Sequence, residues 1–167
     1  MKKFLAILSL AAIGFTAQAQ AEHMIHVKKS ITINAPADKI WAKVGDFGDL
    51  GAWHPAVAKT EIVEGTDNVK GAKRVLTLQD GGKINETLTA YNAKKRSMSY
   101  IITESVLPVD AYSATIKVKP AGKDKSVVTW NANFKAKAGA DDKTATDTIN
   151  GVFDGGLGNL KKTQETM

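Results

Sequence analysis

Glu86 is the polar residue whose sequence surroundings most suggest chemistry. Ile84, Leu88 and Ala90 are expected to share its side of a strand, because side chains two residues apart point the same way. A carboxylate in such company is either paired or has a raised pKa. Glu86 could therefore orient the polar end of a ligand or act as a general base. The alternative is a purely structural pair with Arg74 or with a tyrosine hydroxyl.

Tyr100 and Tyr112 are expected to face the same interior from neighbouring strands. Each combines an apolar ring with a polar tip, which suits a pocket of mixed character, although ordinary core packing is the favoured explanation for such rings. Trp53, Trp130 and Phe153 complete the aromatic candidates for a cavity, and core packing is the main interpretation of Trp130.

His54 lies in the loop Trp53-His54-Pro55 and is the remaining candidate cavity residue. Histidine titrates near neutrality, so an acid or base role is conceivable. No serine or cysteine nucleophile pattern accompanies it, and a gate or a partner contact fits the loop better than catalysis. We therefore predict no catalytic residue.

Metal and cofactor sites are not predicted. The histidines are His23, His26 and His54, no two of which have a metal-ligand spacing, and the chain has no cysteine. Neither a phosphate-binding glycine loop nor a dinucleotide fingerprint occurs. Asp80-Gly81-Gly82 is typical of a hairpin turn.

The elements that would position these residues follow from hydrophobic periodicity. Residues 25–34 alternate as a strand, and Pro36 then opens a helical pattern that glycines divide into two short helices. Six further strands are predicted at 57–64, 72–79, 83–92, 96–106, 111–119 and 125–135. A helix of about 20 residues follows, with Asp141 and Asp142 at its start and Lys161 and Lys162 near its end, as the helix dipole favours.

Four glycines interrupt this last helix, at positions 151, 155, 156 and 158. Each interior glycine costs roughly 0.5–1 kcal/mol relative to alanine, so a reason for them is expected. Either the helix backbone approaches the sheet closely, or the missing side chains leave room for a ligand.

The element order predicts an α+β fold in which a curved, seven-stranded antiparallel sheet encloses the long C-terminal helix. This order resembles the helix-grip fold of the START-like superfamily, also called SRPBCC, and within it the polyketide cyclase/dehydrase-like branch. The similar strings are residues 33–41, 44–55, 86–88, 99–100, 107–109 with Tyr112, and 156–160. The resemblance implies a central hydrophobic cavity, in a fold that serves lipid transfer, hormone sensing, cyclisation and scaffolding alike.

The N-terminus indicates export. Lys2 and Lys3 precede a short apolar run and a small-residue cleavage signal, so we expect a signal peptide over 1–19 and one domain over 20–167. Cleavage after Ala19 or, alternatively, after Ala21 would release the protein into the periplasm. The apolar run is shorter than the roughly 20 residues that span a bilayer, so no stable membrane insertion is expected.

The charge of the chain is modest. Its formal net charge of +6 falls to +4 without Lys2 and Lys3, and no basic block marks nucleic-acid binding. With its signal segment the chain is most similar to MxaD-type proteins, which are periplasmic accessories of methanol oxidation. That similarity implies contact with a periplasmic dehydrogenase and a cytochrome c.

We therefore predict a non-catalytic binding or adaptor protein. The alternatives are a carrier of a small hydrophobic ligand and an enzyme of the cyclase or dehydratase type.

Overall fold

The computed structural model describes residues 23–166, so the predicted signal peptide lies outside the described residues. Within them the elements are β1 (Ile25–Ile33), α1 (Ala37–Val44), the 3-10 helix η1 (Phe47–Ala52), β2 (Val57–Glu64), β3 (Lys73–Leu78), β4 (Lys83–Asn92), β5 (Ser97–Ser105), β6 (Val109–Pro120), β7 (Ser126–Ala136) and α2 (Asp142–Glu165). The strands form one antiparallel sheet in the order β1-β7-β6-β5-β4-β3-β2. The predicted fold class is confirmed.

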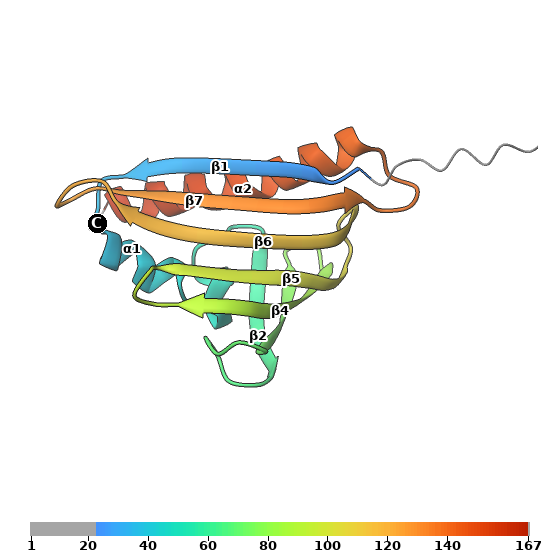
Figure 1. The fold of residues 1–167 in the computed structure, drawn as a ribbon, viewed down its shortest axis with the longest axis horizontal. Helices are drawn as coiled ribbons and strands as arrows, with labels where there is room; N and C mark the ends of the chain where they lie inside the picture. The colour runs from blue at the N-terminus through green and yellow to red at the C-terminus, as the bar shows by residue number, and fades with distance from the viewer. Residues whose placement is uncertain (1–22, 167) are drawn as a thin grey trace, which may run out of the picture.

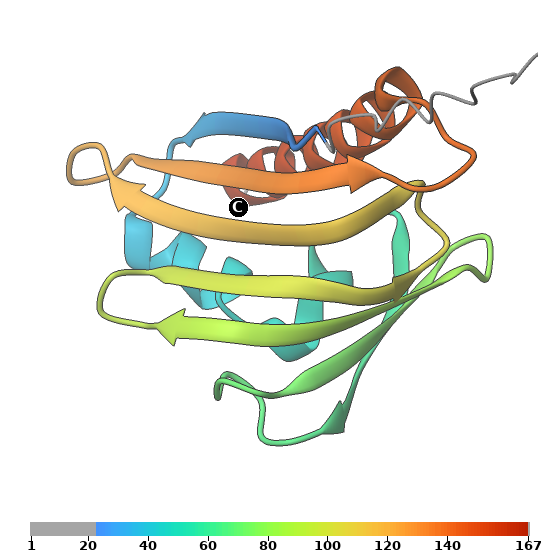
Figure 2. The ribbon, with the colours of Figure 1, turned by 45° about the vertical axis from the view of Figure 1, so that its right-hand side comes forward.

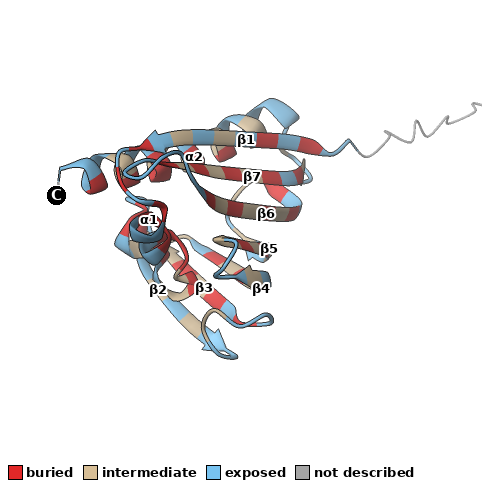
Figure 3. Ribbon diagram, turned by 60° about the vertical axis from the view of Figure 1, so that its left-hand side comes forward, coloured by how far each residue is buried: buried red, intermediate tan, exposed pale blue. Residues whose placement is uncertain are grey.

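The sheet curves so that β2 and β3 swing away from the plane of β1, β7 and β6 (Figure 2). Alternation along the strands explains which face is buried. Tyr112, Ala114, Ile116 and Val118 of β6 point into the core, as the sequence predicted, and the intervening residues face solvent or the rim. Buried residues alternate with more exposed ones along the strands, as the banding of β1, β7 and β6 shows (Figure 3), and they form one core with residues of the helices.

The helix α2 packs on the concave side of β1 and β7 (Figure 1). Its N-terminus is capped by Asp141, whose Oδ1 accepts a hydrogen bond from the Thr144 N–H at 2.7 Å. Ile149, Phe153 and Leu157 form its buried stripe. At 24 residues the helix is somewhat longer than the sequence indicated. None of the helices in the described range is both long and apolar enough to cross a bilayer.

The two short helices between β1 and β2 close the concave side below α2. In η1 the Asp46 side chain accepts a hydrogen bond from the Gly48 N–H at 3.0 Å, and the backbone kinks at Asp49. Phe47 and Leu50 of this segment are buried, which places η1 against β2 and β3. The segment therefore forms one wall of the interior.

One predicted inward residue is on the wrong side. Ala90 was expected to continue the buried set of β4, but it is exposed. The register between β4 and β5 shifts between Leu88 and Ala90, which is a β-bulge. The extra residue exchanges the inward and outward positions at the end of β4, so Tyr91 packs against the core in place of Ala90.

Candidate ligand cavity

A cavity lies between the sheet, α2 and η1, with about 70 Å³ of room for the centres of water-sized molecules. Five of the predicted residues line it: His54, Glu86, Tyr100, Tyr112 and Trp130. The rest of the lining is aliphatic and consists of Leu50, Ala56, Val57, Leu76, Leu78, Ile84, Ile102, Leu107, Ile149 and Val152. The cavity is thus an apolar chamber with a few polar groups, as small-molecule sites usually are.

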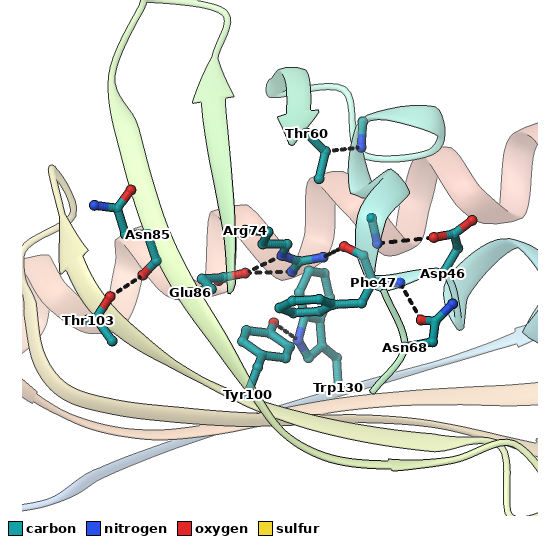
Figure 4. Close-up of polar contacts among 12 residues, drawn as sticks. Asp46, Phe47, Thr60, Asn68, Arg74, Asn85, Glu86, Tyr100, Thr103 and Trp130 are labelled. Atoms are coloured by element: carbon teal, nitrogen blue, oxygen red, sulfur yellow. Dashed lines mark hydrogen bonds and ion pairs between the residues drawn. The ribbon is translucent and has the colours of Figure 1, made fainter. Parts of the chain in front are cut away.

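The polar centre of this cavity is an ion pair between Glu86 and Arg74 (Figure 4). The two residues are directly opposite each other on β4 and β3, so their side chains project to the same face. Glu86 Oε2 accepts a hydrogen bond from Arg74 Nε at 2.6 Å, and the ion-pair distance from Oε2 to Nη2 is 2.5 Å. Both side chains are at least 95 % buried, so the ion pair is almost completely shielded from bulk water.

The neighbouring segments fix the Arg74 guanidinium in place. Its Nη1 donates to the Phe47 carbonyl oxygen at 2.6 Å, and its plane lies over the Phe47 ring with Cζ 4.1 Å from the centroid. The Phe47 N–H in turn donates to Asn68 Oδ1 at 2.9 Å. The loop between β2 and β3 therefore holds η1, and η1 holds the arginine that pairs with Glu86.

Glu86 retains acceptor capacity toward the cavity. The hydrogen bond and the shortest ion-pair contact from Arg74 both involve Oε2, and no described residue donates a hydrogen bond to Oε1. Burial raises the pKa of the carboxyl, and the Arg74 charge and hydrogen bond oppose that rise. The sequence alternatives for this residue combine: Glu86 is paired with Arg74, and it also borders the cavity with one free oxygen.

Tyr100, Tyr112 and Trp130 form an aromatic wall. Trp130 Nε1 donates to the Tyr100 hydroxyl oxygen at 2.9 Å, and the two tyrosine rings are 6.4 Å apart. Burial raises the pKa of both tyrosine hydroxyls, and the Glu86 charge adds to the rise. Both hydroxyls therefore stay protonated at neutral pH and can serve only as neutral hydrogen-bonding groups.

His54 links the loop after η1 to α2. Its Nε2 lies 2.9 Å from the Val152 carbonyl oxygen, while Nδ1 accepts from the Ala56 N–H at 3.3 Å. A ring that accepts at Nδ1 and donates at Nε2 is neutral. Burial lowers the pKa of His54, which agrees with that tautomer. Both ring nitrogens are thus committed to the backbone.

Two of the predicted cavity residues stand behind the wall instead of lining the cavity. Phe153 stacks on Trp130 with the ring centroids 4.3 Å apart, and Trp53 packs 5.6 Å from the same indole. Sequence reasoning missed the aliphatic lining from η1, β3 and α2. The signal was present in the alternation of Leu76 and Leu78, but it did not show which apolar side chains border empty space.

The glycines of α2 have two different environments. A Cβ atom on Gly156 would lie 2.5 Å from His54 Cδ2, so close approach requires this glycine. Around Gly151, Gly155 and Gly158 a Cβ would meet nothing within 4 Å. Close approach therefore explains Gly156 alone, and its partner is the loop after η1 instead of the sheet that the sequence suggested. None of the four glycines lines the cavity.

No group of three or more histidine or acidic side chains in the described part of the chain is arranged to hold a metal ion.

The sequence profile of the family described as "Polyketide cyclase / dehydrase and lipid transport" matches residues 24–165, which contain every element above. The chain belongs to this family. Among solved structures, the protein XoxI from Bacillus cereus is 29% identical with a TM-score of 0.77, covering 83% of this chain and 94% of that one.

Two more distant structures share the fold. A START superfamily protein from Mycobacterium smegmatis has a TM-score of 0.72 at 14% identity and covers 84% of this chain and 97% of its own. The Zhui aromatase/cyclase from Streptomyces sp. R1128 has a TM-score of 0.70 at 19% identity, with 86% and 94% covered. These likenesses confirm the START-like architecture, and family membership supports a ligand-binding domain.

Proposed function

We propose that this protein is a non-catalytic binding protein for a small, largely apolar molecule with one polar end. The cavity that carries this proposal is walled by aliphatic and aromatic side chains and has Glu86 Oε1 as a free acceptor. An apolar ligand body would replace water at the aliphatic wall, and a hydroxyl or amide N–H on the ligand would satisfy the carboxylate.

The state of the polar groups supports binding over catalysis. A general base needs a lone pair free to take a proton from the substrate. Both nitrogens of His54 are engaged by the backbone, and Glu86 is held by Arg74. The tyrosine pKa values are raised, which removes phenolate chemistry near neutrality. The cyclase-type alternative would therefore depend on Glu86 Oε1, and the Arg74 charge beside that carboxylate opposes its taking a proton.

The size of the cavity limits the ligand. A single water needs about 10–15 Å³ of such room, so about 70 Å³ accepts only a few water-sized groups. Larger ligands would require the half-buried lining side chains to turn outward, namely Leu78, Ile102, Leu107 and Val152. A one-ring alcohol or phenol is the size class that the cavity favours.

Two neighbouring isoleucines on β5 give a matched test. Ile102 lines the cavity, and Ile101 lies on the opposite face with 36% of its surface exposed. Titration with phenol, followed by tryptophan fluorescence because Trp130 lines the cavity, should show saturable binding. Ile102→Trp should fill the cavity and abolish binding, and Ile101→Trp should retain it. Equal affinity in both variants would show that phenol binds elsewhere and would contradict the proposal.

We further propose that the protein acts in the periplasm, as an adaptor between a dehydrogenase and a cytochrome c. The exported-type N-terminus and the likeness to MxaD-type proteins support this role. Fractionation of the native cell, followed by co-purification from the periplasmic extract, tests it. Recovery of the protein with neither a quinoprotein dehydrogenase nor a cytochrome c would contradict the adaptor role and leave the cavity proposal standing.

A further inference from the structure

Lysines that are scattered in the sequence meet at one end of the fold. The β4–β5 and β6–β7 turns lie at the same end of the sheet, because the flanking strands pair in antiparallel register up to Asn92↔Ser97 and Pro120↔Ser126. The helix α1 lies at this end as well (Figure 1). Arg96 Nε in the first turn donates to Asp38 Oδ1 of α1 at 2.6 Å, which joins the two segments.

The first half of this surface comes from α1 and the β4–β5 turn. Lys39 and Lys43 are exposed on the outer side of α1, and Lys94 and Lys95 are exposed at the tip of the turn. None of these four amines is in an ion pair with a described carboxylate.

The second half comes from β6, the β6–β7 turn and the end of α2. Lys119, Lys123 and Lys125 are exposed along the turn, and Lys162 is exposed in the last turn of the helix. Lys161 Nζ donates to the Thr32 carbonyl oxygen at 3.0 Å, which fixes the end of α2 beside the end of β1. The eight exposed lysines of these two halves are called here the basic end face.

Within the segments that form this face, little negative charge offsets the lysines. Asp38 is paired with Arg96, and Glu165 is engaged by Lys161 at 3.8 Å and by the Asn34 N–H at 2.8 Å. Asp124 is the remaining acid in these segments. The eight lysines therefore leave a local excess of seven charges, larger than the +6 of the whole chain. The remainder of the protein is close to neutral or slightly acidic.

The composition of the face indicates what it can bind. The large apolar side chains that are exposed in the described chain are Met24, Val63, Val69, Ile101 and Val106, and none belongs to these segments. A membrane surface is held firmly only when apolar insertion accompanies the charge, which this face does not offer. Phosphate recognition favours free arginines, and Arg96 is tied to Asp38. Hydrated lysines with no apolar core suit a transient contact with an acidic protein surface.

We propose that the basic end face is a docking site for an acidic patch on a partner protein, in a transient, salt-sensitive complex. The ligand cavity is independent of this site. Two of its half-buried lining residues, Leu78 at the end of β3 and Leu107 in the β5–β6 loop, lie at the opposite end of the strands. Docking through the lysines thus leaves the cavity accessible.

The test compares two triple charge reversals with equal net charge. Lys94→Glu, Lys95→Glu and Lys123→Glu alter the face, whereas Lys28→Glu, Lys83→Glu and Lys143→Glu alter exposed lysines outside it. The probe is poly-L-glutamate, titrated by calorimetry at low salt and at 0.15 M salt. Amide NMR shifts of the unchanged protein should map to residues 93–96 and 119–125.

We expect the face variant to lose at least about tenfold in affinity for poly-L-glutamate and the control to lose less than about threefold, since exposed charges contribute modestly one by one. Binding to the unchanged protein should weaken as salt rises. Equal losses in the two variants, or shifts spread over the whole surface, would overturn the proposal. So would tighter, face-dependent binding to phosphatidylglycerol vesicles or to a DNA oligonucleotide.

Discussion

At the scale of single residues, the buried ion pair of Glu86 and Arg74 dominates the interior. Burying two charges is costly, and their mutual attraction repays that cost only when geometry and additional hydrogen bonds are good. Here Arg74 has four supports: the carboxylate, the Phe47 carbonyl and the rings of Phe47 and Tyr100, whose centroid lies 5.3 Å away. The pair therefore fixes the position of the cavity's acceptor as well as the packing around it.

Removing one partner of this pair should be far more damaging than removing both. Arg74→Met leaves a buried carboxylate without its cation and should lower the free energy of unfolding by about 3–5 kcal/mol. The double variant Arg74→Met with Glu86→Leu removes both charges and should recover most of that loss. Urea unfolding followed by circular dichroism measures both. If Arg74→Met were as stable as the unchanged protein, the ion pair would make no contribution to stability and the prediction would be wrong.

His54 should make stability depend on pH. Its folded pKa lies below the ordinary 6.5 because the ring is buried, so the unfolded chain binds the proton more readily. Stability from this residue is complete above pH 6.5 and falls as the pH drops from there toward the folded pKa, by at most about 1.4 kcal/mol per pH unit. Thermal unfolding of the unchanged protein and of His54→Gln, between pH 5 and 8, should show that this slope is reduced in the variant. Parallel pH curves would contradict the assignment.

At the scale of elements, α2 is held against the loop after η1 by backbone contacts. His54 Nε2 donates to the Val152 carbonyl, and Asn159 Nδ2 donates to the Trp53 carbonyl at 2.9 Å. Between these two bonds the helix backbone at Gly156 lies directly against the His54 ring, and any larger residue at this position would collide with that ring. The helix covers the core, and the same contact places Ile149 and Val152 on the cavity wall.

Two adjacent glycines in this helix should respond in opposite ways to alanine. Gly156→Ala places a methyl group 2.5 Å from His54 Cδ2 and should destabilise the protein by about 1–3 kcal/mol. Gly155→Ala meets nothing within 4 Å and should stabilise it by about 0.5–1 kcal/mol through helix propensity. Chemical denaturation of both variants gives the comparison. Similar changes of one sign would mean that α2 does not approach the loop this closely.

At the scale of the whole molecule, the described core begins at Ile25 and ends at Leu160. Both ends of this range are tied into the fold, β1 by its pairing with β7 and the end of α2 by the bond between Glu165 and the Asn34 N–H. This core is therefore closed at both of its ends by contacts between described residues.

A chain that starts at residue 20 should consequently be as stable as the full chain. We expect the two free energies of unfolding to agree within about 0.5 kcal/mol, the usual range for changes outside a core. Parallel urea titrations measure this difference. The mass of the protein recovered from the periplasm separately shows whether processing follows Ala19 or Ala21. A large loss of stability in the shorter chain would contradict the proposed domain boundary.

Sequence periodicity was sufficient for the elements of this protein, because local alternation and helical spacing carry that information directly. Strands, the C-terminal helix and the inward positions of Tyr112 and Trp130 followed from it. The same periodicity placed Glu86 on the interior face. It failed at Ala90, where a bulge depends on pairing with another strand.

Tertiary structure alone decided what depends on distances between remote segments. It paired Glu86 Oε2 with Arg74 and left Oε1 without a donor among the described residues. It also committed both nitrogens of His54 to the backbone and assigned close approach to Gly156 alone among four similar glycines. It also gathered lysines from four separate segments at one end, although the sequence shows no basic block. Such features are sums over contacts between residues far apart in the chain, and no local pattern records them.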